Sequence, residues 1–258
     1  MFQNQEAYLW SRVLPIAKLT WNKGKRMRYD TILMDADETI LDFSQAERSA
    51  FARTLEKYEI TCTEEVFALY SDINHGLWKS FERGEISKQE ILDRRFRETF
   101  QRLGIRGEFP GLEEAYQTAL SEGSFIIEGA DEVCRRLSEH CRLYVVTNGV
   151  AATQHRRMKE SGLRVWFRDV FVSEEVGYQK PKREYFDYVF ARIPDMVPER
   201  TLLVGDSLTS DIAGGKGAGV DTCWMCRSGR IEEGLGKADY IITDLRELYG
   251  IVGGAEHE

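Results

Sequence analysis

Residues 31–43 read Thr-Ile-Leu-Met-Asp-Ala-Asp-Glu-Thr-Ile-Leu-Asp-Phe, and this stretch decides the fold. Its apolar run ends at Asp35 and Asp37 and predicts a buried, parallel-type strand with two carboxylates at its C-terminal edge. Because residues two apart on a strand point to the same side, both carboxylates are expected to face one small site. Open α/β sheets bind ligands at that edge, and a cation such as Mg²⁺ relieves the repulsion between two acids. For this segment taken alone, a strand that runs into a plain acidic turn is the alternative.

A second segment, residues 143–149, has the same design with different polar ends. It reads Leu-Tyr-Val-Val-Thr-Asn-Gly and predicts a strand that ends in Thr147 and Asn148. A helical pattern starts near Ala151, so both side chains are expected beside a helix N-terminus. The free N–H groups and the dipole of such a terminus favour a phosphate group.

Two more segments complete the pattern. Lys180 precedes a proline and a helical run, and it supplies a point positive charge. Residues 202–211 read Leu-Leu-Val-Gly-Asp-Ser-Leu-Thr-Ser-Asp and predict a strand that ends in Asp206, with Asp211 five residues further on. Each segment alone is common loop chemistry. The order of all four along one chain is what indicates a function.

In this order the four segments resemble the motifs of the haloacid dehalogenase-like superfamily of aspartate-based phosphotransferases, from about Arg28 to about Tyr249. The sequences DADET, TNG and SEEVGYQKP are most similar to the corresponding motifs of the noncanonical pyrimidine nucleotidase branch of subfamily IA. The resemblance implies an α/β fold, with a doubly wound, Rossmann-like parallel sheet and an all-helical cap inserted into it.

The resemblance also implies roles for individual residues. Asp35 would attack phosphorus and form an aspartyl-phosphate, while Asp37 would protonate the leaving alkoxide and then deprotonate the water that hydrolyses the intermediate. Mg²⁺ would take oxygens from Asp35, Asp206 and the backbone carbonyl of Asp37. Asp211 would orient the metal shell without binding the ion directly. The residues expected to hold the phosphate oxygens are Thr147, Asn148 and Lys180.

The expected function is therefore a Mg²⁺-dependent phosphomonoesterase, acting on a pyrimidine nucleoside 5′-monophosphate. Asp37 argues against dehalogenation, which has no alkoxide to protonate. A phosphatase of small sugar phosphates or phosphoglycolate, or a phosphomutase, would keep all four motifs and differ in its cap. A non-catalytic regulatory protein would be expected to lack Asp35, Asp37 or Asp206, and all three are present.

Composition limits the partners. The 258 residues include 42% hydrophobic and 30% charged side chains, which is ordinary for a globular protein of one or two domains. The net charge of −8 argues against nucleic-acid and anionic-membrane partners, so the expected partner is a small phosphorylated metabolite. No apolar run reaches the roughly 18 residues of a membrane span. Five cysteines without framework spacing suggest a reducing compartment, and we expect a cytoplasmic protein.

The pattern divides the chain into three parts. Residues 1–27 are expected to be an extension without chemistry, residues 45–121 a helical cap, and residues 28–44 with 122–258 the α/β core. Within the cap, apolar residues at i, i+3 and i+4 predict four amphipathic helices, at 45–58, 63–83, 87–103 and 112–120.

Two sets of side chains have alternative interpretations. Trp78 and Phe81 lie at helical spacing in the second cap helix, which favours packing in the cap core; the alternative is that they contact a nucleobase. His155, Arg156 and Arg157 follow one another in a helical run after the second strand, and this predicts a solvated face.

Overall fold

The computed structural model describes residues 27–253 and is built around one six-stranded, parallel sheet. The strand order is β3-β2-β1-β4-β5-β6, the order of a doubly wound Rossmann-like sheet, which confirms the predicted fold class. All strands therefore end at the same edge of the sheet. The strands are β1 (Thr31–Met34), β2 (Arg142–Thr147), β3 (Asp169–Val172), β4 (Thr201–Gly205), β5 (Asp221–Met225) and β6 (Tyr240–Ile242).

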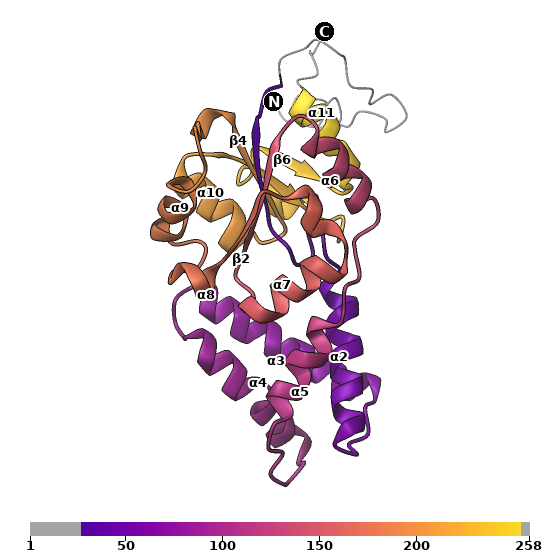
Figure 1. Ribbon diagram of the computed structural model, residues 1–258. Helices are drawn as coiled ribbons and strands as arrows, with labels where there is room; N and C mark the ends of the chain where they lie inside the picture. The colour runs from indigo at the N-terminus through magenta and orange to yellow at the C-terminus, as the bar shows by residue number, and fades with distance from the viewer. Residues whose placement is uncertain (1–26, 254–258) are drawn as a thin grey trace, which may run out of the picture.

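Helices cover both faces of the sheet, because alternate side chains of each strand point to opposite faces. On β1, Ile32 and Met34 join the hydrophobic core on one face and Leu33 joins the core on the other. Figure 1 shows these helices around the sheet. The first core includes α6 (Ala130–Ser138), α7 (Ala151–Glu160) and α11 (Leu248–Gly253), and the second includes α9 (Arg183–Phe190) and α10 (Ala213–Ala218).

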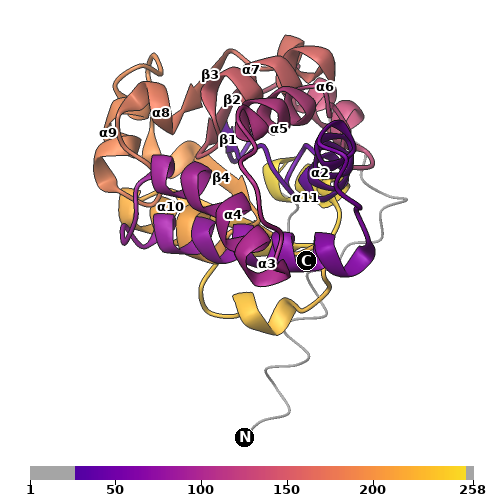
Figure 2. The same cartoon turned by 90° about the horizontal axis from the view of Figure 1, so that it is seen from below.

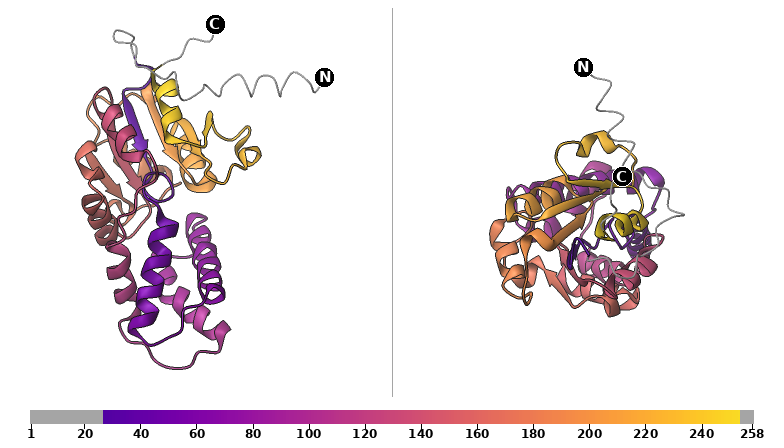
Figure 3. Two further views of the ribbon diagram at one scale, coloured as in Figure 1. Left: turned by 90° about the vertical axis from the view of Figure 1, so that its right-hand side faces the viewer. Right: turned by 90° about the horizontal axis from the view of Figure 1, so that it is seen from above.

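The chain between β1 and α6 forms a separate helical bundle, which Figure 3 shows below the sheet in its left view. α2 packs against α5 and α3 packs against α4. Seen from below, α3 and α4 lie side by side in front of the sheet (Figure 2). These four helices match the four predicted ones within two residues at each end: α2 (Phe43–Lys57), α3 (Glu64–Glu82), α4 (Lys88–Leu103) and α5 (Leu112–Ser121).

Local sequence signals explain where the bundle helices begin and end. At the start of α4 the Ser87 hydroxyl accepts a hydrogen bond from the N–H of Glu90, while the Glu90 carboxylate accepts one from the N–H of Ser87 at 2.8 Å. This capping box satisfies two donors that a helix start leaves free. Gly104 ends the helix with a φ of 68°, a left-handed conformation that glycine adopts without a steric penalty.

The bundle has an aromatic core of its own. Phe51 lies at its centre with no exposed surface, and its ring stacks on Tyr70 at a centroid distance of 4.3 Å. Such ring pairs add to the free energy that burial of their area provides. The other buried aromatic residues of this core are Phe67, Phe96, Phe100 and Tyr116. The bundle is thus held together by contacts between its own helices.

The remaining connections are short. They comprise α8 (Ser173–Val176), the 3₁₀ turns η2 (Leu163–Trp166), η3 (Pro198–Arg200), η5 (Ile231–Gly234) and η6 (Leu245–Glu247), and the π turn η4 (Leu208–Ile212). Within residues 27–253 no helix is both long and apolar enough to cross a bilayer. The expected extension, residues 1–27, lies outside the described residues except for Met27. The residue boundaries expected for core and cap stay a prediction.

The aromatic core gives a test of cap stability. Phe51→Ala should lower the free energy of unfolding by about 3–5 kcal/mol, because it removes a fully buried ring and leaves a cavity. Urea titration followed by circular dichroism measures this loss. Val165→Ala is the control, since Val165 is 74% exposed and its truncation should change stability by less than about 0.5 kcal/mol. Equal effects of the two substitutions would contradict the assignment of Phe51 to a core.

Candidate active site

Asp35 and Asp37 lie in a tight turn that follows β1 and not on the strand itself. The N–H of Asp35 still donates to the carbonyl of Val204 at 2.8 Å, which continues the β1–β4 ladder. The carbonyl of Ala36 then accepts two N–H groups from further along the turn, and Glu38 adopts a left-handed φ of 56°. We expected both carboxylates to face one site because side chains alternate along a strand. The shared site is found, but alternation along a strand is not the reason. Both acids line one cavity because the chain turns there.

This cavity lies at the edge of the sheet between β1 and β4, where the order of the strands reverses. β1 and β4 are neighbours in the sheet, and between them the chain order reverses, which is the position where α/β sheets bind ligands. Asp35 follows β1 and Asp206 follows β4. The cavity has a volume of about 770 Å³, and every residue predicted for the core site lines it: Asp35, Asp37, Thr147, Asn148, Lys180, Asp206 and Asp211.

Lys180 is the buried cation at the centre of the site. Its ammonium donates to Asp35 Oδ1 at 2.6 Å, to Asp211 Oδ1 at 2.7 Å and to the carbonyl of Val146 at 2.7 Å. Burial acts to lower the pKa of Lys180, but the carboxylates of Asp211 and Asp35 outweigh it and raise the pKa. Lys180 thus stays charged, with all three of its donors used.

Three carboxylates face this single ammonium. Oxygens of Asp35, Asp206 and Asp211 all lie within 4.8 Å of one another. Burial raises the pKa of Asp35 and of Asp206, and the neighbouring carboxylates raise both pKa values further. Such a cluster is relieved either by a shared proton or by a second cation.

The acids differ in the oxygens they leave free. Asp211 uses one oxygen for Lys180 and the other for the N–H of Ser207 at 3.0 Å. The carboxylate of Asp206, in contrast, accepts no hydrogen bond from residues 27–253. Asp35 and Asp206 are therefore the acids with carboxylate oxygens that could hold a hard cation such as Mg²⁺.

A π turn places Asp211. After β4 the chain first makes η4 and only then α10. The N–H of Ile212 reaches back five residues to the carbonyl of Ser207 at 3.1 Å. Gly205 makes room for this turn, since a Cβ there would lie 2.3 Å from the carboxyl carbon of Asp211.

The Thr-Asn-Gly segment after β2 contributes two different side chains. Thr147 Oγ1 accepts hydrogen bonds from the N–H of Gly149 at 3.1 Å and from Gln154 Nε2 at 3.2 Å, which leaves its hydroxyl hydrogen to donate. The Asn148 amide instead makes two hydrogen bonds with the backbone of Lys180, at 2.9 and 3.0 Å. Asn148 thus orients Lys180, and its own contact with phosphate stays a prediction.

Two residues of the site were missed in the sequence. Arg157 donates to Asp37 Oδ1, and Gln154 donates to Asp37 Oδ2 at 2.5 Å. The predicted solvated face is right for His155 and Arg156, whose side chains are 44% and 46% exposed, but wrong for Arg157, which is fully buried. The helical period could have predicted the burial of Arg157, because Arg157 lies next to the buried Met158 on the inward face of α7.

The cap covers the cavity with a polar network and with aromatic rings, among them Phe43 and Trp78. Asn74 donates to Glu47 at 2.7 Å, and Arg95 donates to Asn74 at 3.3 Å. Burial raises the pKa of Glu47 despite its hydrogen bonds. Trp78 lines the cavity, whereas Phe81 is 5% exposed and packs within the cap.

Several polar contacts join the cap to the core, among them those of Glu82 and Lys88. Glu82, near the end of α3, accepts hydrogen bonds from the hydroxyls of Ser207 and Thr209. Lys88, at the start of α4, donates to the carbonyl of Gly149 at 2.6 Å. Burial lowers the pKa of Lys88 to about 8. These contacts hold the cap helices against the loops that carry the acids.

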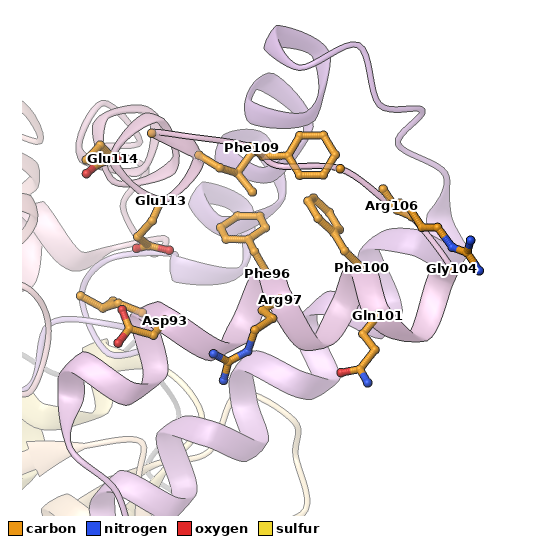
Figure 4. Close-up of a pocket in the computed structure, with 15 residues that line it drawn as sticks. Asp93, Phe96, Arg97, Phe100, Gln101, Gly104, Arg106, Phe109, Glu113 and Glu114 are labelled. Carbon is orange, nitrogen blue, oxygen red and sulfur yellow. The ribbon is translucent and has the colours of Figure 1, made fainter.

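A second cavity, of about 800 Å³, lies within the cap between α4 and the loop that leads to α5. Phe96, Phe100 and Phe109 turn their rings toward one another in its wall (Figure 4). None of the residues predicted for the core site lines this cavity. The cavity at the sheet edge is therefore the candidate active site.

Comparison with known proteins agrees with this geometry. The family model of haloacid dehalogenase-like hydrolases matches residues 29–219, which include all four motif segments. The chain belongs to this family. It is accordingly a hydrolase of the phosphatase type, and the resemblance seen in the sequence is confirmed.

Three relatives of this haloacid dehalogenase-like hydrolase cover most of its length. The HAD-hydrolase YfnB of Bacillus subtilis is 44% identical over 225 residues, 87% of this chain and 96% of the relative. Its crystal structure, bound to magnesium, has a TM-score of 0.82 and covers 87% of this chain and 98% of that one. The pyrimidine 5′-nucleotidases PynA of Streptococcus pneumoniae and YjjG of Escherichia coli are 37% and 34% identical, over 77% and 86% of this chain and 84% and 97% of theirs.

The tight packing at Gly205 gives a test of the site. Gly205→Ala should displace Asp211 from Lys180, with a loss of about 1–3 kcal/mol in stability and about tenfold or more in phosphatase activity. Gly217→Ala is the matched control, because a Cβ at this helical position meets nothing within 4 Å. Thermal unfolding and phosphate release measure the two effects. A Gly205 variant as active and stable as the Gly217 variant would show that Asp211 does not need this approach.

Proposed function

We propose that this protein is a Mg²⁺-dependent phosphomonoesterase that hydrolyses pyrimidine nucleoside 5′-monophosphates through an aspartyl-phosphate. The observation that carries the proposal is the single cavity in which Asp35 and Asp37 face a hydroxyl donor and a buried lysine. Phosphoryl transfer requires mainly such positioning and neutralisation of charge.

Asp35 is the nucleophile in this proposal. Its carboxylate attacks phosphorus, a new P–O bond forms, and the ester P–O bond breaks. Asp37 gives a proton to the leaving alkoxide, so the nucleoside departs as an alcohol. Asp37 then takes a proton from the water that attacks the aspartyl-phosphate, which releases inorganic phosphate and restores Asp35.

Other residues of the chain hold the phosphate and the charges. The free hydroxyl hydrogen of Thr147 is available to a phosphate oxygen, and Lys180 keeps positive charge beside Asp35. The residues that would hold Mg²⁺ are Asp35, Asp206 and the backbone carbonyl of Asp37, with Asp211 orienting the shell. The ion would supply the second positive charge that three crowded carboxylates require.

The substrate class rests on the relatives and on the cap. PynA and YjjG are named pyrimidine 5′-nucleotidases, and they match 77% and 86% of this chain. The cavity extends from Asp35 to Trp78 and Asn74 on α3, so a phosphate at the acids places the nucleoside against the cap. We therefore assign Trp78 to the contact with the base and leave Phe81 to the cap core.

A screen of phosphate release tests this function. With Mg²⁺ the protein should release phosphate from UMP and dUMP faster than from hexose phosphates or phosphoglycolate, and excess chelator should abolish the activity until Mg²⁺ is restored. Asp35→Asn should reduce release to background while the fold is kept, because the nucleophile is lost. Phosphate is measured colorimetrically and the fold by circular dichroism.

The control for this screen is Asp187→Asn, which changes a 55% exposed aspartate paired with Arg183 on the surface of α9. It should keep full activity. Turnover by Asp35→Asn, or full activity in chelator, would contradict the mechanism. Preference for a sugar phosphate would contradict the substrate class and leave the mechanism in place.

The role of Trp78 gives a separate prediction. A stacked base contributes about 1–3 kcal/mol, so Trp78→Ala should raise the KM for UMP about tenfold. The KM for β-glycerophosphate, which has no base, should change by less than about twofold on the same reasoning. Steady-state kinetics on both esters check this. Equal losses would mean that Trp78 acts only in packing, as part of its edge-to-face pair with Phe81.

A further inference from the structure

The Asp37 carboxylate accepts hydrogen bonds from two residues of α7. Gln154 Nε2 donates to Asp37 Oδ2 at 2.5 Å, and Arg157 donates to Asp37 Oδ1. The two donors are three residues apart, so they lie on the same face of the helix. Hydrogen bonds to both oxygens fix the plane of the carboxylate as well as its position.

The two donors are themselves immobilised. The second contact of Arg157 runs from Nε to the carbonyl of Gly123 at 3.0 Å, and its side chain has no exposed surface. Gln154 is 2% exposed and also donates to Thr147 Oγ1 at 3.2 Å. A Cβ at Gly149 would lie 2.3 Å from the Gln154 amide nitrogen, so the glycine after Asn148 is what admits this side chain.

Stability alone is a poor reason for this arrangement. Removing a guanidinium from water costs several kcal/mol, and a buried ion pair often contributes no more stability than an apolar pair of the same volume. The Arg157 side chain also leaves one buried NH₂ group without a hydrogen-bond partner among the described residues. Gln154 and Arg157 both line the active-site cavity, beside Asp37 and Thr147.

We propose that Gln154 and Arg157 form a clamp that positions the Asp37 carboxyl group for proton transfer, an inference that rests on the proposed function. Proton transfer to the leaving oxygen requires a heavy-atom separation of about 2.6–3.2 Å, and a misplacement of about 1 Å can cost on the order of a hundredfold in rate. Each carboxylate oxygen has a second acceptor site, so Asp37 can carry and donate the proton while the clamp holds it. The clamp residues are positioning residues, and Gln154 also joins Asp37 to the hydroxyl of Thr147.

The dependence on the leaving group separates positioning from packing. UMP releases an alkoxide that needs a proton, whereas p-nitrophenyl phosphate releases a stabilised phenolate that does not. The value of kcat/KM reports the first transfer from each ester. Hydrolysis of the aspartyl-phosphate needs Asp37 as a base after either ester, so a misplaced Asp37 should make this second step limiting.

The experiment compares Gln154→Met and Arg157→Lys with the wild type and with Arg156→Lys. Gln154→Met keeps the side-chain length and removes the donor, and Arg157→Lys keeps the charge and removes the fork that reaches two acceptors. Arg156 is the matched control, because it is the adjacent residue on α7 and pairs with Glu122 at the surface. Thermal unfolding shows which variants are folded, and Gln154→Met carries the test if Arg157→Lys is not.

Both clamp variants should lose about tenfold or more in kcat/KM for UMP and less than about threefold for p-nitrophenyl phosphate. With the second ester, a burst of one nitrophenolate per enzyme should precede slow turnover, because the aspartyl-phosphate accumulates. Arg156→Lys should behave as the wild type on both esters.

Three results would overturn the inference. Equal losses on the two esters without a burst would make the clamp a packing feature only. Faster turnover by a clamp variant would mean that Gln154 and Arg157 hold Asp37 away from the substrate. A wild-type protein without activity on either ester would contradict the proposed function and therefore the clamp. If the wild type is active and only the clamp variants behave differently from expectation, the clamp alone is contradicted.

Discussion

The site depends on one buried ammonium group. Lys180 lies between Asp35 and Asp211 and donates to both and to the carbonyl of Val146, so it joins the segments that follow β1 and β4 to strand β2. Without this charge, the buried carboxylates that follow β1 and β4 would repel one another without a compensating cation in the chain beside them. Two further contacts keep Lys180 beside the carboxylates. Asn148 holds the main chain of Lys180, and Gly205 leaves room for Asp211 to approach the Lys180 ammonium.

Much of this arrangement could be predicted from sequence, because it depends on local patterns. Apolar runs predict the strands, and polar residues directly after them meet at one edge whatever the connections between them. Arg157 could not be recognised in this way. Its neighbours His155 and Arg156 are exposed, and its partner Asp37 is 120 residues away. The burial of a charged side chain is decided by a partner that arrives from elsewhere in the fold, and the π turn at Asp211 likewise depends on tertiary contacts.

The division of labour between core and cap also follows from the contacts. The acids and the lysine lie on loops of a rigid sheet, where small displacements are costly for chemistry. The cap adds Trp78 and the network of Asn74 and Glu47 from the opposite side of the cavity. Helix α7 lies between the two parts: it begins beside the Thr-Asn-Gly segment, and α5 packs against it. A change in how the cap packs on α7 therefore reaches the residues that hold Asp37.

The place of the cap in the chain has a consequence for the order of folding. β1 is a central strand, and its residue Thr31 pairs with Arg142 on one side and Thr201 on the other. During synthesis the strand that carries Asp35 emerges early, but its first neighbour β2 begins only at Arg142 and its second neighbour β4 only at Thr201. The helices α2 to α5 all lie within residues 43–121 and pack on one another through contacts that are nearer in sequence than the pairings of β1 with β2 and β4, and nearer contacts form faster. The cap is thus the part of the molecule that can fold before the active site that it covers.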